Sequence, residues 1–557
     1  MTTVDPLDVA DILDAGFATY RRRRTSITRR AFARFEAKDW AAMRRDALER
    51  RDAYGRTIDE VIADLGAASF TVSDRSEWAT AMRLFRGRYL SDPFRPIAET
   101  FFNSVARKLF ATEGTDTVVE FLDSPDDPPD TAESPMSRTH AGDDSFEWIH
   151  DVLRDCRFHM SWEDIHSDVA NASERLPFTP DHVQVVDRLF FRGKAAYLVG
   201  SISSGDQSIP FSFAIRHGRS GLRIAAVLVG EKDVSILFSY TRAAFLVAAD
   251  APCALVDFLS GLLPHRPEAE IYAAIGFRKQ AKTERYRDLV RYLSHSDDLF
   301  VEAPGTKGLV MIVFTLPGYE VVFKVVRDRF PPQKSVTPRQ VAERYQFVSR
   351  HDRAGRLVEA QRFERLALPL SRFEPKMLEE LLGEASRTVT VSQAEVMFEV
   401  VYVERRVTPL DMFIREADPH EAASGIIDYG ATIKNLAASN IFPGDMLLKN
   451  FGVTNSGRVV FYDYDELREL TECHFRSFPV SSDPTDEMSV TPAFGVGPND
   501  VFPEELPRFL GLRPELRSIF EEQHADLFTP DFWVNVQRRI ESGETIEILP
   551  YSRTRSL

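Results

Sequence analysis

The sequence predicts an α+β protein with two large domains, and three observations lead to this fold class. The chain has 557 residues, of which 43% are hydrophobic, so it is too long for one ordinary core. Apolar residues recur at helical spacing between about residues 9 and 110, whereas short alternating runs separated by glycines follow between about 182 and 247. A second group of alternating strands begins beyond residue 299. We therefore expect one domain over residues 1–298 and a second over 299–557.

Composition excludes several classes of protein. A net charge of −16 argues against nucleic acid as a partner of the chain as a whole. The cysteines Cys156, Cys253 and Cys473 lie far apart and lack metal-binding spacing, so neither a disulfide framework nor structural zinc is predicted. The sequence contains no apolar run of roughly 18 residues, and its first residues lack the basic and apolar segments of a leader. We expect a cytoplasmic protein with no membrane partner.

The first domain is expected to be mainly helical, with one small antiparallel sheet. Helices are predicted up to about Phe110 and again from Glu268 to His295. The segment 123–144, rich in Asp, Pro, Ser and Thr, is too polar to pack and is expected to be an acidic loop. Five short apolar runs predict a meander of strands at residues 183–191, 195–201, 211–216, 222–229 and 234–238.

A basic run stands out in the first domain, at Arg21–Arg24 and continuing with Arg29, Arg30 and Arg34. Such a run can bind a phosphate-bearing ligand, but more often it is the solvated face of a helix. The first domain shows no catalytic constellation, so its role must follow from that of the second domain.

A polar loop in the second domain has the spacing of a kinase catalytic loop. Asp445 is followed five residues later by Asn450, and Asp463 follows the β-branched apolar run 459–461. Asp445 is placed to orient the attacking hydroxyl or accept its proton, while Asn450 and Asp463 offer hard oxygens to Mg²⁺. The alternative is a capped loop that leads into a buried strand, with Asp463 opening a turn.

The residues around this loop favour the catalytic interpretation. Asn455-Ser456-Gly457 predicts a hairpin turn between Phe451–Thr454 and Arg458–Tyr462. A loop, a hairpin and then a metal-binding strand is the order that a kinase site requires.

A glycine-bearing turn and a single lysine upstream resemble a nucleotide lid. The turn precedes two alternating strands, and the second strand carries Lys324 in an apolar run, where it is placed to contact the α- and β-phosphates. An exposed loop and a strand-edge lysine are the alternative. The expected nucleotide-binding turn consists of Ala303, Pro304, Gly305, Thr306, Lys307, Gly308 and Leu309.

The segment between Lys324 and the catalytic loop is predicted to contain one helical region and one buried strand. The helical region covers Thr337–Phe363, and the partners expected for the lysine are Glu343, Glu359 or Glu364. The strand 396–403 ends at Glu404, where the backbone of a kinase hinge meets adenine.

Several motifs in the second half occur together and in order. They are Ala-Pro-Gly-x-x-Gly at 303–308, Phe-Lys-Val at 323–325, Gln333-Lys334, His351-Asp352-Arg353, Glu404-Arg405-Arg406, residues 442–453 and residues 459–466. With this set the chain resembles the bacterial isocitrate dehydrogenase kinase/phosphatase family. The length of the chain also fits that family.

The resemblance implies a bilobal, protein-kinase-like domain and a bifunctional enzyme. Such an enzyme phosphorylates and dephosphorylates a serine of isocitrate dehydrogenase, its protein partner, and so controls flux between the Krebs cycle and the glyoxylate bypass. It implies ATP and Mg²⁺ as cofactors, ADP for the phosphatase direction, and an N-terminal regulatory domain that responds to AMP. A homodimer is compatible with the resemblance.

The resemblance also assigns roles to individual residues. The ATP loop falls on Ala303–Leu309, the ATP lysine on Lys324, the catalytic aspartate on Asp445, and the metal residues on Asn450 and Asp463. One position departs from the family pattern. The family has an aspartate implicated in the phosphatase reaction within Arg-Met-Ala-Asp-Thr-Gln, whereas this chain has Glu359 within Arg-Leu-Val-Glu-Ala-Gln.

Two other functions remain open from the sequence. A small-molecule kinase of the aminoglycoside type shares the catalytic loop but has no use for a large regulatory half. A nucleotide-sensing binding protein would carry the same groups without using them for catalysis.

Overall fold

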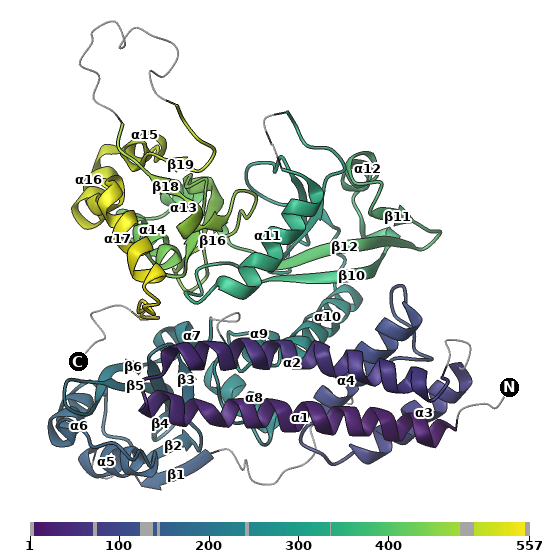
Figure 1. Cartoon of the computed structure of the whole chain (residues 1–557), viewed down its shortest axis with the longest axis horizontal. Coiled ribbons are helices and arrows are strands. Elements are labelled where there is room, and N and C mark those ends of the chain that lie inside the picture. The colour runs from purple at the N-terminus through teal and green to yellow at the C-terminus, as the bar shows by residue number, and fades with distance from the viewer. Residues whose placement is uncertain are drawn as a thin grey trace, which may run out of the picture. The chain divides into compact units, whose positions relative to one another are not determined.

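The computed structural model describes residues 5–70, 75–122, 137–141, 145–239, 244–332, 334, 336–478 and 495–551. Contacts between Cα atoms divide the chain into two compact units. Unit 1 consists of Met1–Asp297, Arg365–Leu368 and Leu549–Leu557, and unit 2 of Asp298–Glu364 and Pro369–Ile548. Figure 1 shows the elements of both units.

Four helices begin unit 1: α1 (Pro6–Glu36), α2 (Trp40–Ala67), α3 (Arg75–Arg88) and α4 (Arg95–Phe110). Helix α1 begins where the Asp5 side chain accepts a hydrogen bond from the Leu7 amide, and α2 begins at Asp39 in the same way. The two long helices lie side by side in Figure 1. These four helices confirm the helical region that the spacing of apolar residues predicts up to about Phe110.

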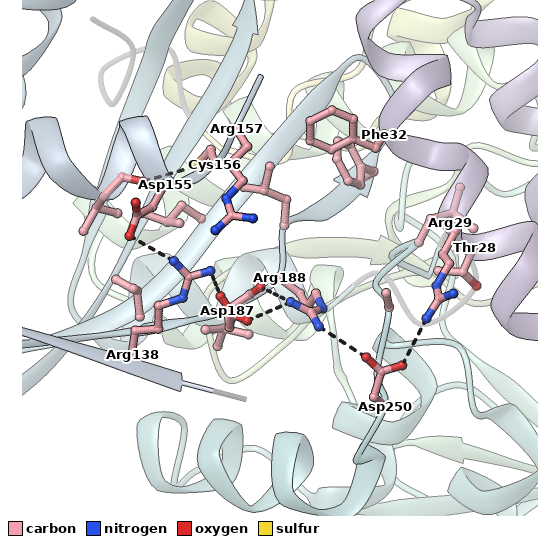
Figure 2. Close-up of a pocket in the computed structure, with 18 of the residues that line it drawn as sticks. Thr28, Arg29, Phe32, Arg138, Asp155, Cys156, Arg157, Asp187, Arg188 and Asp250 are labelled. Atoms are coloured by element: carbon pink, nitrogen blue, oxygen red, sulfur yellow. Dashed lines mark hydrogen bonds and ion pairs between the residues drawn. The ribbon is translucent and has the colours of Figure 1, made fainter. Parts of the chain in front are cut away.

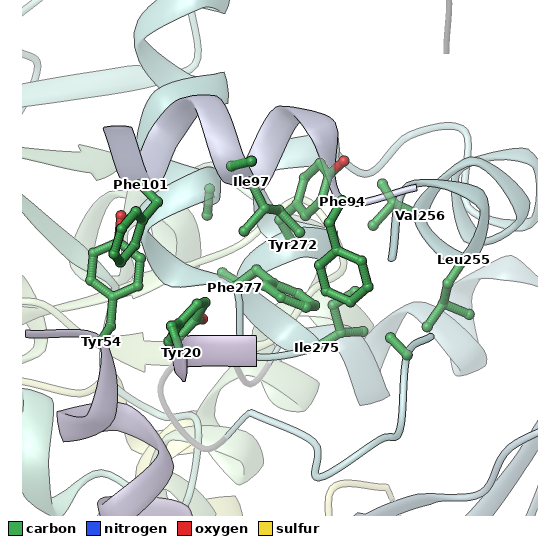
Figure 3. Packing of buried hydrophobic residues seen from close by; sticks show 14 of the residues in the cluster. Tyr20, Tyr54, Phe94, Ile97, Phe101, Leu255, Val256, Tyr272, Ile275 and Phe277 are labelled. Carbon is green, nitrogen blue, oxygen red and sulfur yellow. The ribbon is translucent and has the colours of Figure 1, made fainter. Parts of the chain in front are cut away.

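The core of unit 1 is rich in aromatic rings, as Figure 3 shows. The rings of Tyr20 and Tyr54 meet edge to face with centroids 5.0 Å apart, and Phe101 lies 5.8 Å from Tyr54. Tyr272 and Phe277, far along the chain, complete the same cluster. Burial of such large rings is the main source of stability for this helical layer.

The sheet of unit 1 is an antiparallel meander, as the sequence predicts. Its strand order is β1-β2-β4-β5-β6, with β3 paired to β4. The strands are β1 (Ser137–Ala141), β2 (His182–Val186), β3 (Phe190–Arg192), β4 (Ala195–Ser204), β5 (Gln207–His217) and β6 (Leu222–Val229). Two short helices, α5 (Ser145–Asp155) and α6 (Ile165–Glu174), precede β2.

The fifth predicted strand, 234–238, is wrong: these residues belong to helix α7 (Glu231–Phe238). Gly230, at φ +87°, ends β6 and begins the helix, and Glu231 and Asp233 occupy its first turn. Val234, Leu237 and Phe238 are buried at helical spacing. Three further helices follow: α8 (Pro252–Leu262), α9 (Glu268–Ala274) and α10 (Arg278–His295).

Part of the segment expected to be an acidic loop is described. Residues 137–141 form strand β1, which pairs antiparallel with β2 from Ser137 opposite Val186 to Ala141 opposite His182. Residues 123–136 and 142–144 lie outside the described residues.

Unit 2 contains a second antiparallel sheet, with strand order β10-β12-β9-β8-β7 and β11 paired to β12. Lys324 lies on an inner strand of this sheet, because β9 lies between β8 and β12. The strands are β7 (Val301–Glu302), β8 (Met311–Thr315), β9 (Val321–Val326), β10 (Ala360–Pro369), β11 (Val389–Val391) and β12 (Glu395–Arg405).

The helical region predicted over Thr337–Phe363 is too long. Helix α11 (Pro338–His351) begins with a capping box between Thr337 and Gln340 and ends at His351, after which the chain turns and enters β10. The ring of Tyr345 on α11 stacks on that of Tyr402 on β12, with centroids 4.0 Å apart. This contact packs α11 against the sheet.

The remainder of unit 2 is mainly helical, with small strand pairs. Its larger helices are α12 (Pro375–Glu384), α13 (Leu410–Glu416), α14 (Pro419–Ala438), α16 (Pro514–His524) and α17 (Pro530–Glu541). Asp428 on α14 receives two hydrogen bonds from Arg356, at 2.6 and 2.7 Å, and one from the Val459 amide at 2.7 Å. Burial opposes ionisation of Asp428, but the Arg356 charge outweighs it and lowers the pKa of this carboxyl. This network fixes α14 against the strand that precedes Asp463.

The polar segment near the C-terminus is described only at its ends. His474–Phe475 (β18) pairs parallel with Asp500–Val501 (β19), and residues 479–494 lie outside the described residues.

Among the described helices of both units, none is long and apolar enough to cross a bilayer.

Candidate active site

Lys324 stands on β9 with Val313 of β8 as its cross-strand neighbour on one side and Tyr402 of β12 on the other. Its ammonium is buried, donates a hydrogen bond to the Tyr462 carbonyl at 3.0 Å, and lies 5.2 Å from the centre of the Tyr462 ring. The sheet therefore directs this lysine toward the segment that contains Asp463.

The acidic partner of Lys324 is Glu404, and the partners expected from the sequence are wrong. Glu404 Oε2 lies 2.7 Å from the lysine Nζ, and the exposed fractions of the two side chains are 1% and 8%. Glu404 is two residues beyond Tyr402, which is directly opposite Lys324, so both side chains point to the same face of the sheet. Neighbouring strands, rather than a helix and a strand, thus supply this ion pair.

The loop that contains Asp445 follows β14 (Ile441–Phe442) and depends on one glycine. Gly444 has φ +79°, and a Cβ at this position would lie 2.5 Å from the carbonyl oxygen of Glu466. Asp445 follows, and its Oδ1 accepts a hydrogen bond from the Leu447 amide at 3.0 Å. The close approach of Gly444 brings the loop against the chain that follows Asp463.

The predicted hairpin is confirmed. Strand β15 (Phe451–Val453) pairs antiparallel with β16 (Val459–Phe461), and Phe451 is opposite Phe461. The Tyr462 amide donates to the Asn450 carbonyl at 3.1 Å, which places Asn450 beside the end of β16. Asn450 is buried, and its Nδ2 donates to the backbone carbonyl of Asp445 at 3.3 Å. Its amide oxygen thereby remains available as an acceptor.

Asp463 and Asp465 form a pair of acids in a poorly hydrated place. Burial raises the pKa of Asp463, the charge of Asp445 adds to this effect, and the charges of Lys324 and Lys334 oppose it. Burial and the Asp463 charge raise the pKa of Asp465 to about 7. The ionised forms of both acids are therefore disfavoured, and a neighbouring positive charge stabilises them.

Lys334 and Asp465 are site residues to which sequence reasoning assigned no role. Lys334 Nζ lies 2.8 Å from Glu466 Oε1 and 3.9 Å from Asp465 Oδ2. Burial lowers the pKa of Lys334, but the hydrogen bond that Lys334 donates to Glu466 and the charges of the neighbouring acids outweigh this and raise the pKa overall. The Asp-x-Asp spacing at 463–465 was the signal available for Asp465.

The oxygen atoms that this site offers as ligands fit Mg²⁺. The described residues contain no cluster of three or more His, Cys, Asp or Glu side chains that could hold a metal alone. Mg²⁺ commonly uses one or two protein oxygens together with waters and phosphates, and Asn450 and Asp463 can supply that number. Burial is the main reason why the pKa of each acid is raised, and a bound cation would stabilise both in the ionised form.

Glu359 follows a residue that is held against β16, and no hydrogen bond or ion pair joins its side chain to Lys324. The Val358 amide donates to the Phe461 carbonyl at 3.1 Å, so the preceding residue is held against the end of β16. Glu359 itself lies between α11 and β10 and is half-buried, with no hydrogen bond or ion pair from its side chain among the described residues. Its carboxylate is therefore not neutralised by a described cation.

The turn Ala303–Leu309 joins β7 to β8, as a nucleotide lid requires, and is mostly exposed. The Ala303 amide donates to the Val313 carbonyl at 3.0 Å, and Gly305 has φ +113°. Lys307 lies 2.7 Å from Glu380 on α12, so its charge is engaged by that helix. We therefore expect the backbone amides of this turn, rather than the Lys307 side chain, to approach the phosphates.

The order of these elements defines a protein-kinase-like domain. An antiparallel sheet holds the lysine, a loop holds Asp445, and a hairpin brings Asn450 and Asp463 to that loop. The spacing of these residues in the sequence is weak evidence for a kinase site. Their arrangement around one buried lysine, however, matches the requirements of phosphoryl transfer.

Comparison with known proteins identifies the family. The kinase domain of "Isocitrate dehydrogenase kinase/phosphatase (AceK)" matches residues 298–553, and the regulatory domain of the same family matches 10–297. A protein of Anaeromyxobacter sp. (strain Fw109-5) named isocitrate dehydrogenase kinase/phosphatase is 44% identical over 573 residues, covering 99% of each chain. One of the same name from Pectobacterium carotovorum subsp. carotovorum (strain PC1) is 38% identical, covering 98% of this chain and 94% of its own length. The chain belongs to the isocitrate dehydrogenase kinase/phosphatase family.

Proposed function

We propose that this chain transfers the γ-phosphoryl group of ATP to a serine of isocitrate dehydrogenase and also removes it. The convergence of Asp445, Asn450 and Asp463 around Lys324 supports the transfer chemistry, and the names of the relatives support the substrate. The two activities together would control flux between the Krebs cycle and the glyoxylate bypass. Residues 299–557 would then act as the catalytic domain and 1–298 as the regulatory one.

The kinase direction assigns one role to each residue. Lys324, held by Glu404, binds the α- and β-phosphates, while the backbone of Ala303–Leu309 covers them. Asp445 orients the serine hydroxyl and accepts its proton. Asn450 and Asp463 hold Mg²⁺, which when bound neutralises charge on the phosphates.

The phosphatase direction requires a water molecule placed against phosphoserine, with ADP in the nucleotide site. Glu359 supports this role because it is half-buried, follows a residue held against β16 and has no described cation to neutralise its carboxylate. A carboxylate in such a place can orient the water or remove its proton. The glutamate is one methylene longer than the family's aspartate, so its oxygens are expected to lie about one bond further out.

The proposal also includes regulation by AMP and a cytoplasmic location. Unit 1 has its own hydrophobic core and a complete sheet, which supports a separate role as the sensor of AMP. The three cysteines are all unpaired, which suits a reducing cytoplasm.

Labelled ATP tests this function directly. The whole chain is incubated with γ-labelled ATP, Mg²⁺ and purified isocitrate dehydrogenase, and the labelled protein is then returned to fresh enzyme with ADP. Label that enters isocitrate dehydrogenase, and is released in the second step, supports both activities. Label found only on small molecules would identify a small-molecule kinase, and no transfer at all would indicate a binding protein.

A further inference from the structure

Unit 1 contains a cavity that the catalytic proposal does not use. It has a volume of about 390 Å³ and lies between α1, the end of α5 and the strands β1–β3, as Figure 2 shows. This volume is within the range of pockets that enclose small organic ligands.

Six charged side chains around this cavity form one alternating chain. Arg138 lies 2.9 Å from Asp155 and also pairs with Asp187, and Asp187 lies 2.7 Å from Arg188. Arg188 lies 3.3 Å from Asp250, which in turn is 3.9 Å from Arg29. The dashed lines in Figure 2 follow this chain, so all three carboxylates are engaged by arginines.

Arg157 is a seventh charge and has no described partner. It lines the same cavity, is exposed, and makes no side-chain hydrogen bond or ion pair among the described residues. Four arginines thus face three aspartates, which leaves an excess of one positive charge in a chain whose net charge is −16. An anion is the ligand that this excess favours.

The backbone at Arg157 is in a conformation that favours glycine. Arg157 has φ +54°, two residues after α5 ends at Asp155, and its amide donates to the Arg154 carbonyl at 3.1 Å. Glycine is the usual residue where a helix ends in this left-handed conformation. Arg157 therefore occupies a position where glycine would be less strained, although a cation just beyond a helix C-terminus also interacts favourably with the helix dipole.

Apolar side chains also line the cavity. Phe32 of α1 stacks on Phe158 with centroids 5.3 Å apart, and it is one of the lining residues labelled in Figure 2. Val152, Leu189 and Leu246 also line the cavity. In addition, the buried Nε2 of His140, another lining residue, has no hydrogen-bond partner among the described residues. The cavity therefore combines an apolar surface with polar groups that still lack partners.

We propose that this cavity binds a small organic anion, a carboxylate or a phosphate monoester with an apolar or planar body. The guanidinium of Arg157 contacts the anionic group, Nε2 of His140 supplies a further hydrogen bond, and Phe32 contacts the body of the ligand. The chain of ion pairs holds Arg138 and Arg188 in place, so that the acids cannot neutralise Arg157. The site is in unit 1 and is separate from the nucleotide site of unit 2.

Calorimetric titration of the whole chain tests this site, with Mg²⁺ and a non-hydrolysable ATP analogue present to fill the nucleotide site. Phenyl phosphate, benzoate and the neutral benzyl alcohol serve as probes. At least one anion should bind about tenfold or more tightly than the alcohol, because hydrogen bonds between charged groups are the stronger kind. Whichever anion binds more tightly identifies a phosphate or a carboxylate as the natural group.

Arg157→Gly is the decisive variant, because it removes the guanidinium and also suits the positive φ. It should weaken binding of the preferred anion about tenfold while the Tm without ligand stays equal or rises. Arg154→Gln is the matched control, since Arg154 is exposed in the last turn of α5 and its side chain pairs only with Asp151 among the described residues. The affinity of this variant for the anion should equal that of the parent. Failure of both anions to bind the parent at about 10 mM, or equal affinity of the parent and Arg157→Gly, would overturn the proposal.

Discussion

The nucleotide site of unit 2 and the arginine-lined cavity of unit 1 use charge in opposite ways. In the first, Lys324 and Glu404 are 8% and 1% exposed, whereas Arg188 and Asp250 in the second are 40% and 52% exposed. Water screens an exposed pair and leaves it free to move, but a buried pair is held in one geometry. Catalysis requires fixed groups, whereas reversible sensing of a ligand requires groups that can exchange partners.

The comparison also predicts where mutations are most costly. When one partner of a buried ion pair is removed, the other charge remains in a poorly hydrated place without compensation, and the whole site is disturbed. An exposed arginine that is removed mainly takes its own contact with it. The predictions below test this contrast, beginning with the largest expected effect.

Asp445→Ala should reduce phosphorylation of isocitrate dehydrogenase by about 10²–10⁴-fold, because a group that orients or deprotonates the hydroxyl acts mainly on the transition state. Nucleotide affinity should change little, and turnover together with ATP titration measures both. Asp526→Ala, an exposed carboxylate paired with Lys434, is the control and should keep full turnover. A variant within about threefold of the parent would exclude the catalytic role of Asp445.

Glu359→Ala should slow dephosphorylation by about 10²-fold and phosphorylation far less, since only the first reaction must activate water. Both directions are assayed on one preparation. Glu364→Ala, an exposed glutamate paired with Arg362 on β10, is the matched control. Equal losses in both directions would instead point to nucleotide positioning. Glu359→Asp is assayed alongside, and a gain of phosphatase activity over the parent would show that side-chain length matters.

Asp463→Ala and Asn450→Ala should both increase the Mg²⁺ concentration required for half-maximal activity. We expect a shift of roughly tenfold for Asp463 and roughly threefold for Asn450, because only the aspartate carries charge. Activity measured over a Mg²⁺ titration gives the two shifts. Identical titration curves for the parent and both variants would show that the metal is held by other groups.

The contribution of Asp465 to stability should fall as pH rises between about 4 and about 7 in the absence of Mg²⁺. The pKa of Asp465 is raised from 3.8 to about 7, so the folded chain binds more protons than the unfolded chain across this window. Asp465→Asn removes that carboxylate, and its Tm relative to the parent should therefore increase by about 2 °C between about pH 5 and about pH 7. The Tm difference would stay constant with pH if Asp465 ionised normally.

Local sequence was sufficient for much of the fold and for the centre of the site. The hairpin at 451–461 is confirmed, because turn residues and alternating apolar residues are neighbours in the chain. Strand β6 was predicted with the bounds that the structure gives, Leu222–Val229. The strand predicted at 234–238 was wrong, because a short, mainly apolar run fits a buried strand and a helix equally well, and the turn at Gly230 decided between them.

The sequence by itself determined which residue types stand at catalytic spacing, since Asp445, Asn450 and Asp463 lie within 19 consecutive residues of the chain. Only the tertiary structure decided what surrounds them. Glu404 became the partner of Lys324 because β9 and β12 are paired in one register, and no local pattern fixes the register between distant strands. The cavity at Arg157 likewise depends on α1, α5 and β1–β3 meeting in space, because an ion-pair chain across such separated segments exists only once the core has packed.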